Sequence, residues 1–291
     1  LSDAEAASLL KDLANRPLGI DEEFRGISGA GAQDKLIACV RNGRILLPLH
    51  GTPSTHILKP GIDRFPESVF NEWFCMRLAS VCGFATADAD ILTFGGDPYY
   101  VTTRYDRETN NGRTERLHQE DFAQALGIPA AEKYEPESGS YLKDMFTLLK
   151  NQSVNPLEDQ LKLWDLTVFN YLIGNTDNHL KNVSLLYDSE LSTVRLAPAY
   201  DVVSTTVYPG STRRLSMRIG DAATVDDVNE DSFRKAAHEI GLGEKLALKR
   251  LSAMIEKFEA ALNATAEELA IQGFSNALQL RDQILLTGGC S

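Results

Sequence analysis

The sequence predicts an α+β protein of two lobes, a small β-rich lobe over residues 1–106 and a larger all-helical lobe over residues 107–291. Three observations support this division. Short apolar runs rich in β-branched residues, separated by turn residues, fill the first part of the chain. Apolar residues at helical spacing dominate from His118 onward. The chain has 291 residues and is 43% hydrophobic, so it is long enough to bury a sizeable core.

Five strands and one inserted helix are expected in the first lobe. The chain opens with a short helix over residues 2–14, because Ser2 and Glu5 have the spacing of a capping box. The Asn42-Gly43 pair between two apolar runs is typical of a β-hairpin. The expected strands span residues 36–40, 44–47, 56–58, 91–94 and 99–103, and the inserted helix spans residues 67–81.

The second lobe is expected to be built around one buried helix over residues 158–173, which is apolar on nearly all sides. The other expected helices span residues 119–126, 141–149, 232–240 and 244–262. We expect the chain to pass between the lobes near residues 104–107.

Charge and composition favour some classes of function over others. The net charge of −12 argues against direct binding of nucleic acid, which needs clustered Lys and Arg, and fits a basic protein partner better. No apolar run approaches the roughly 18 residues of a membrane span, and no signal-peptide pattern is present, so the chain is expected to be cytoplasmic. Structural disulfides and zinc sites are not expected from the four cysteines, Cys39, Cys75, Cys82 and Cys290.

The most informative segment spans residues 174–182, where Asp177 and Asn182 have D-x-x-x-x-N spacing directly after the apolar helix. Asp201 follows a short strand-like stretch. In kinases such a loop aspartate accepts the proton of the acceptor hydroxyl, and the asparagine and a later aspartate hold magnesium. The alternative is an ordinary polar turn after a helix. Between the two motif residues, His179 either supports the site or is a plain turn residue, and Lys181 either neutralises charge on the γ-phosphate or is an exposed loop lysine.

The first lobe offers candidate phosphate contacts. Residues 28–35 form a loop of small residues before a strand, where backbone N–H groups can approach phosphates closely, although an ordinary turn is an equal alternative. Lys59 ends an apolar strand and suits a nucleotide phosphate, unless it is a solvated strand-end lysine. Glu72 on the following helix is a candidate ion-pair partner for Lys59, with Glu67 as its competitor.

Taken together and in this order, these stretches resemble the HipA family of Ser/Thr protein kinase toxins from type II toxin–antitoxin modules. The resemblance covers about residues 16–220 and implies a bilobal protein-kinase-like fold. The matching stretches are Phe24–Lys35, Thr55–Pro60, Glu67–Glu72, Arg104–Arg107, Leu117–Asp121, Lys133–Glu135, Gly174–Asn182 and Ala199–Val202.

The resemblance implies a role for each matching residue, with ATP and Mg²⁺ as cofactors. Asp177 would be the catalytic base, and Asn182 and Asp201 the magnesium ligands. Lys59 would contact the α- and β-phosphates, and Ser28 would be an autophosphorylation site that silences the enzyme. The other residues expected at the nucleotide are Ala30, Gly31, Ala32, Gln33, Asp34, Lys35, Glu72, Thr103, Arg104, Tyr105, His179, Lys181 and Tyr200.

The resemblance also implies partners. A HipB-type helix-turn-helix antitoxin would bind the chain and link it to DNA only indirectly, and the phosphorylated target would be a translation-related protein such as an aminoacyl-tRNA synthetase. HipA proteins carry an N-terminal subdomain before the point where this sequence begins at Leu1, so that piece is either truncated or supplied by a separate protein. The competing interpretations are a small-molecule or lipid kinase and a catalytically silent corepressor.

Overall fold

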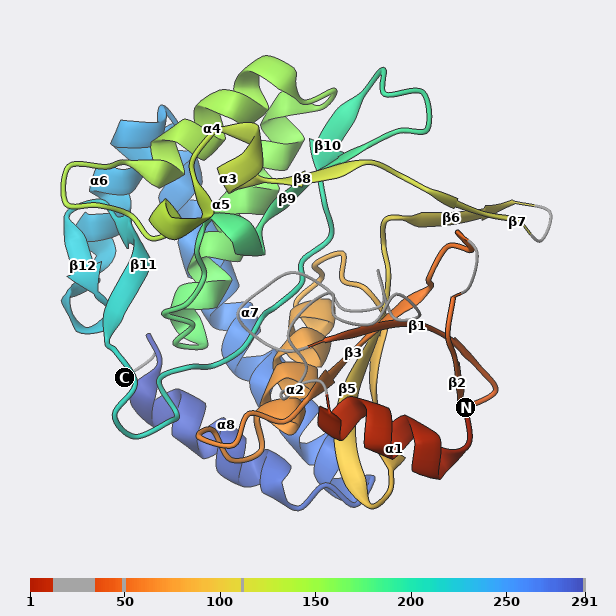
Figure 1. Ribbon diagram of the computed structural model, residues 1–291. Helices are drawn as coiled ribbons and strands as arrows, with labels where there is room; N and C mark the ends of the chain where they lie inside the picture. Colours follow the sequence, from red (N-terminus) through yellow and green to blue (C-terminus); the bar gives the residue numbers. More distant parts are fainter. Residues whose placement is uncertain (13–34, 49–50, 111–112, 290–291) are drawn as a thin grey trace. The chain divides into compact units, whose positions relative to one another are not determined.

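The computed structural model describes residues 1–12, 35–48, 51–110 and 113–289 (Figure 1). The chain divides into two compact units, each described here by itself. The first unit holds Leu1–Trp73 and Ala87–Leu117, and the second holds Phe74–Thr86 and His118–Ser291. The first unit thus extends past residue 106, because the paired residues 107–110 and 113–116 belong to it.

A five-stranded antiparallel sheet forms the first unit, with the strand order β2-β1-β3-β5-β4. All five expected strands are present, and the Asn42-Gly43 turn between β1 and β2 has both residues at positive φ. The inserted helix is α2 (Ser68–Val81). The strands are β1 (Leu36–Arg41), β2 (Arg44–Leu46), β3 (His56–Pro60), β4 (Ala89–Phe94) and β5 (Asp97–Thr103).

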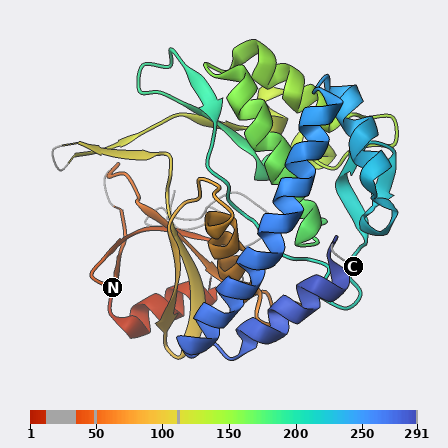
Figure 2. The ribbon, with the colours of Figure 1, turned by 180° about the vertical axis from the view of Figure 1, so that it is seen from behind.

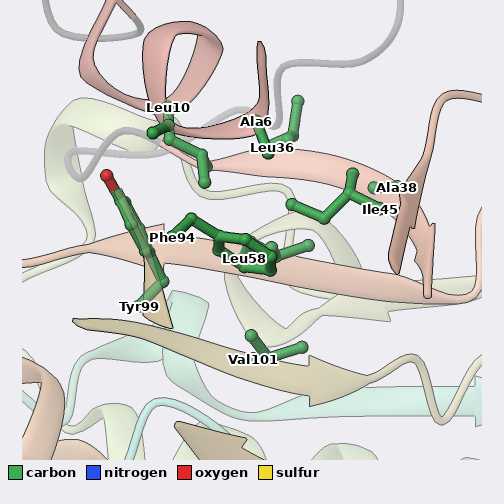
Figure 3. Close-up of a cluster of buried hydrophobic side chains, with 10 residues drawn as sticks. Ala6, Leu10, Leu36, Ala38, Ile45, Leu58, Phe94, Tyr99 and Val101 are labelled. Atoms are coloured by element: carbon green, nitrogen blue, oxygen red, sulfur yellow. The ribbon is translucent and has the colours of Figure 1, made fainter. Parts of the chain in front are cut away.

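The core of the first unit lies between this sheet and α1 (Asp3–Asp12). The expected capping box is present, since Ser2 N–H donates to Glu5 Oε2 at 2.7 Å and Glu5 N–H donates to Ser2 Oγ at 3.3 Å. Figure 3 shows Ala6 and Leu10 of α1 beside side chains from the sheet. The buried residues of this core are Ala6, Ala7, Leu10, Leu36, Ala38, Ile45, Leu58, Phe94, Tyr99 and Val101.

Helices make up most of the second unit, and α5 (Pro156–Leu172) is its centre. Trp164 and Phe169 of α5 are completely buried, and their rings make edge contacts with Phe233 and Phe258 from two other helices. This confirms the buried central helix. The remaining helices are α3 (Phe122–Ala125), α4 (Tyr141–Gln152), α6 (Glu230–Ile240), α7 (Glu244–Ile271) and α8 (Asn276–Thr287), of which α7 is the long blue helix in Figure 2.

The second unit also contains strands, so it is not all-helical. The helix expected over residues 119–126 begins only at Phe122, because the Asp121 side chain caps it by accepting from Gln124 N–H at 2.9 Å. The residues before the cap pair with another strand instead. The strands are β8 (Gln119–Asp121), β9 (Ser184–Tyr187), β10 (Val194–Leu196), β11 (Arg214–Ile219) and β12 (Ala222–Thr224).

Besides strands of the second unit, the sequence analysis missed α8 and the hairpin of β6 (Arg107–Asn110) and β7 (Arg113–Arg116). The hairpin consists almost entirely of charged and polar residues, so it lacks the apolar alternation by which a strand is recognised. Within the described residues, no helix is both long and apolar enough to cross a membrane.

The packing of α1 can be tested by substituting two adjacent glycines in the β4–β5 turn, Gly95 and Gly96. Both have positive φ, but a Cβ on Gly95 would lie 2.7 Å from Ala7 Cβ, whereas a Cβ on Gly96 would meet no atom within 4 Å. Each Ala substitution costs about 1–2 kcal/mol for the left-handed backbone. We expect Gly95→Ala to lower the free energy of unfolding in urea more than Gly96→Ala does. Equal losses would mean that α1 moves aside at no cost.

Candidate active site

In the first unit, Lys59 and Glu72 form a buried ion pair. Lys59 Nζ lies 2.6 Å from Glu72 Oε1, and the two side chains are 6% and 9% exposed. Burying either charge alone would be costly, so each depends on the other. Lys59 is therefore not a solvated strand-end lysine, and of the two carboxylates considered as its partner, Glu72 makes this contact. The pair connects β3 to the first turns of α2.

The segment after β5 is held by a second group of charges. Arg104 donates to both carboxylate oxygens of Asp106, at 2.9 and 2.6 Å, and Arg107 Nη1 lies 2.9 Å from the same carboxylate. Burial alone raises the pKa of Asp106, but the hydrogen bonds and charges of the two arginines outweigh burial and hold this pKa below its ordinary value.

This arrangement limits what the segment can offer an adenine ring. The guanidinium of Arg104 is engaged with Asp106. The backbone N–H groups of Thr103 and Arg104 donate to Asp88 O and Thr55 O, both at 2.8 Å. The backbone carbonyl of Thr103 also accepts a hydrogen bond, from Thr102 Oγ1 at 3.4 Å. Both residues and Tyr105 are half-buried.

The loop of small residues before β1 lies almost wholly outside the described residues. This applies to Ser28 and to the run from Ala30 to Asp34, so the expectations for them stay predictions. Lys35, the first described residue after the gap, is half-buried and directly precedes β1.

In the second unit, the segment that follows α5 is tied to the segment that follows Asp201. Gly174 O accepts the N–H groups of Thr205 and Thr206, both at 3.1 Å, and Thr205 Oγ1 accepts Thr176 N–H at 2.8 Å. Gly174 has φ +69°, and an added Cβ would lie 1.9 Å from Thr206 Oγ1, so only glycine fits there. The two segments that carry the candidate acidic residues are thereby held side by side.

Asp177 is the centre of a closed loop. Its carbonyl accepts His179 N–H at 2.8 Å and Asn182 Nδ2 at 2.9 Å, which explains the D-x-x-x-x-N spacing, because the asparagine amide closes the loop on the aspartate. The nitrogen of the Asn182 amide is thus occupied within the loop, and its oxygen is the atom suited to bind a cation. The loop contains a short 3-10 turn over Leu180–Asn182.

Tyr134 is a member of this site whose role the sequence did not assign. Its hydroxyl donates to Asp177 Oδ1 at 2.9 Å, and its ring meets that of His179 edge-on with centroids 5.3 Å apart. Burial, the hydrogen bond to Asp177 and the charge of Asp177 raise the pKa of Tyr134 to about 12, so the hydroxyl stays protonated at neutral pH. The only sequence signal was its place in the Lys133–Glu135 stretch.

His179 is buried, and its Nδ1 has no hydrogen-bond partner among the described residues. Burial lowers the pKa of His179, and this effect outweighs the opposing charge of Asp177. Its imidazole is therefore neutral at pH 7. A neutral ring beside the loop fits a supporting role in the site better than a plain turn residue, which would be exposed.

Lys181 and Tyr200 hold the loop in place. Lys181 Nζ lies 2.5 Å from Asp121 Oδ2, so its charge is engaged at the start of α3. The Tyr200 hydroxyl donates to Lys181 O at 2.8 Å and accepts from Ser184 Oγ at 2.5 Å. The residue before Asp201 is thus anchored on the loop that carries Asp177.

Asp201 has a left-handed backbone, with φ +53°. Non-glycine residues with positive φ are uncommon, and Asp and Asn tolerate this conformation better than most. Such strain tends to occur at functional sites. Asp201 and the Asn182 oxygen are hard ligands of the kind that Mg²⁺ prefers, and Mg²⁺ takes few ligands from the protein. Within the ranges that the structure describes, no group of three or more His, Cys, Asp or Glu side chains forms a fuller metal site.

Comparisons with known proteins agree on one family. A family model described as HipA-like C-terminal domain matches residues 27–262. The "Putative kinase Y4mE" of Sinorhizobium fredii is 39% identical, and the match covers 92% of this chain and 64% of the relative. The serine/threonine-protein kinase toxin HipA of Shewanella oneidensis is 30% identical, with 89% of this chain and 61% of the relative covered. The chain therefore spans less than two thirds of these two relatives.

Two solved structures show the same fold. The Shewanella oneidensis HipA, solved with HipB and its operator DNA, superposes with a TM-score of 0.81 at 26% identity over 97% of this chain and 69% of that one. The Helicobacter pylori proinflammatory kinase CtkA superposes with a TM-score of 0.54 at 14% identity over 90% of this chain and 92% of that one, which supports the fold alone.

The dependence of Lys59 and Glu72 on each other can be measured. Lys59→Met removes the cation that lies 2.6 Å from the buried Glu72 carboxylate, and we expect the free energy of unfolding to fall by about 3–5 kcal/mol. Adding Glu72→Gln should recover much of this loss, because the double variant has no buried charge at the pair. Urea unfolding of the single and double variants measures both effects.

The matched control is Lys11→Met, which removes an ion pair with Asp97 whose side chains are 60% and 50% exposed. Exposed pairs contribute little to stability, so the unfolding midpoint should hardly change. A Lys59→Met variant that unfolds like this control would contradict the assignment of a buried, mutually dependent pair.

Proposed function

Because the chain belongs to the HipA-like C-terminal domain family and has a protein-kinase-like fold, we propose that it is an ATP- and Mg²⁺-dependent protein serine/threonine kinase. The observation that carries the proposal is the closed loop of Asp177 and Asn182. It presents a carboxylate and an amide oxygen from one rigid turn, with the anchored Asp201 segment beside it. That set matches what phosphoryl transfer requires of a protein.

In the proposed reaction, the carboxylate of Asp177 accepts the proton of a serine or threonine hydroxyl. The oxygen of that hydroxyl forms a bond to the γ-phosphorus of ATP while the bond from phosphorus to the β,γ-bridging oxygen breaks, and ADP leaves. Magnesium, held by Asn182 and Asp201, would neutralise charge on the phosphates. Lys59, oriented by Glu72, would bind the α- and β-phosphates.

The rest of the nucleotide site follows from the same proposal. The backbone of Thr103 to Tyr105 would face adenine, and Lys35 with the preceding residues would cover the phosphates. His179 would line the site as a neutral ring. Lys181 would act mainly through its ion pair with Asp121, and Tyr200 through its anchoring of the loop, rather than as direct phosphate contacts.

We further propose that the kinase is the toxin of a toxin–antitoxin module. HipA of Shewanella oneidensis was solved with HipB and operator DNA, and an antitoxin of that kind is our proposed partner. The net charge of −12 fits a basic, DNA-binding partner better than contact with DNA itself. A translation-related protein, such as an aminoacyl-tRNA synthetase, is the proposed target.

The kinase assignment is tested by incubating phosphatase-treated chain with ATP and Mg²⁺ and mapping phosphate by mass spectrometry. We expect phosphate in the wild type and none in Asp177→Asn, with nucleotide binding retained in both. The matched control is Asp188→Asn, which changes a half-buried carboxylate that accepts from Ser192 and Thr193 outside the proposed site. Transfer that persists in Asp177→Asn would remove it as the base.

The same spectra test the predicted silencing at Ser28. A phosphate there would place a dianion in the loop proposed to cover the triphosphate, which would repel nucleotide. We expect Ser28 to carry phosphate and the modified chain to bind ATP weakly. Modification at other residues with Ser28 bare would contradict this. A chain that binds no ATP with Mg²⁺ at millimolar concentration would instead be a silent corepressor.

A further inference from the structure

The hydroxyl of Tyr134 contacts the one side chain that the proposed reaction needs as its base. Tyr134 Oη lies 2.9 Å from Asp177 Oδ1, although 43 residues separate them in the sequence. Among the described residues, no other donor reaches this carboxylate, so the second oxygen, Oδ2, takes no hydrogen bond from them. The carboxylate therefore has one oxygen held and one available.

The segment that carries Tyr134 is firmly held. Glu135, whose side chain is 4% exposed, accepts Tyr141 N–H at 2.7 Å and Arg218 N–H at 2.6 Å. Lys133 O accepts Leu180 N–H at 3.4 Å. The two neighbours of Tyr134 are thus fixed to α4, to β11 and to the loop of Asp177.

The backbone segments of Tyr134 and Asp177 are both hydrogen-bonded to the same residue, Ser216. Ser216 in β11 accepts Glu135 N–H at 2.9 Å through its carbonyl and donates its own N–H to Thr176 O at 3.1 Å. One residue of β11 thus bonds the residue after Tyr134 and the residue before Asp177. The separation of the two side chains is set by a shared support and not by a flexible surface contact.

The contacts of the Tyr134 ring further define its orientation. His179 meets the ring edge-on, and Lys133 Nζ lies 4.9 Å from its centroid. The residue is nevertheless 49% exposed, so part of its side chain is accessible to solvent. The Tyr134 ring is thus held in place while part of it is open to solvent. This suits a site that a protein acceptor must reach.

From these contacts we propose that Tyr134 is a positioning residue for phosphoryl transfer, which rests on the kinase function proposed above. Its hydroxyl holds Oδ1 of Asp177 and so turns Oδ2 toward the hydroxyl of the protein acceptor. A carboxylate on a single bond rotates freely unless a donor fixes it. Reaction rates fall steeply when a catalytic group is displaced by about 1 Å.

The test compares autophosphorylation by the phosphatase-treated chain and its variants over a range of ATP concentrations. Tyr134→Phe removes the hydroxyl and keeps the ring. We expect the maximal rate constant to fall roughly 10- to 100-fold, less than in Asp177→Asn, because the base remains but is not oriented. The ATP concentration for half-maximal rate and the melting temperature should not change. If the substitution changed the half-maximal ATP concentration and the melting temperature as well, the rate loss would come from a general disturbance of the loop, and the positioning role would be overturned.

Tyr187→Phe is the matched control, because the Tyr187 hydroxyl also donates to a carboxylate, Glu120 Oε2 at 2.6 Å, and also has its pKa raised to about 12. It should autophosphorylate like the wild type. A Tyr134→Phe variant as fast as the wild type, with Asp177→Asn inactive, would overturn the positioning role alone. A variant that autophosphorylates faster than the wild type would also overturn the positioning role, because it would mean that the Tyr134 hydroxyl hinders phosphoryl transfer. Wild-type chain that transfers no phosphate would overturn the kinase function and this role with it.

Discussion

The loop of Asp177 depends on one constraint, which is that backbone groups near a sharp turn must find partners without water. Gly174 turns the chain after α5, and its carbonyl takes two N–H groups from the segment after Asp201. Thr205 and Ser216 then supply the partners of Thr176. Buried backbone groups left unpaired would be costly, so these bonds are obligatory. The same backbone hydrogen bonds therefore fix the segments that carry the acidic residues of the candidate site.

The candidate charged residues of the first unit and Asp177 of the second unit have different kinds of partner. In the first, the charged groups of the candidate site are buried and neutralised in place, as in the Lys59–Glu72 pair and the arginines around Asp106. In the second, Asp177 is half-buried and receives a neutral phenol instead of a cation. A neutral donor orients a carboxylate without cancelling its charge. This suits the role of proton acceptor that we propose for Asp177.

Much of the fold and part of the site could be predicted from the sequence, and the family assignment was confirmed. The five strands of the first sheet follow from local patterns. The Lys59–Glu72 pair was expected by analogy with kinases, with Glu67 as the alternative partner. Tyr134 and Ser216 could not be assigned in the same way, because their roles come from contacts across long stretches of sequence and, for Ser216, from the backbone alone. The expectation that Lys181 and Arg104 face nucleotide stays a prediction, and the ion pairs that both side chains make with nearby carboxylates were not expected from the sequence.

The left-handed backbone of Asp201 has a consequence for how inactive forms of this protein should be made. Alanine in that conformation is penalised by its Cβ, whereas asparagine, like aspartate, adopts it more readily. An alanine at this position would therefore alter the main chain and delete the carboxylate at once, and its phenotype would confound the two. Asparagine removes the charge in a residue that tolerates this backbone, so it is the better substitution for testing the metal-binding role that we propose for Asp201.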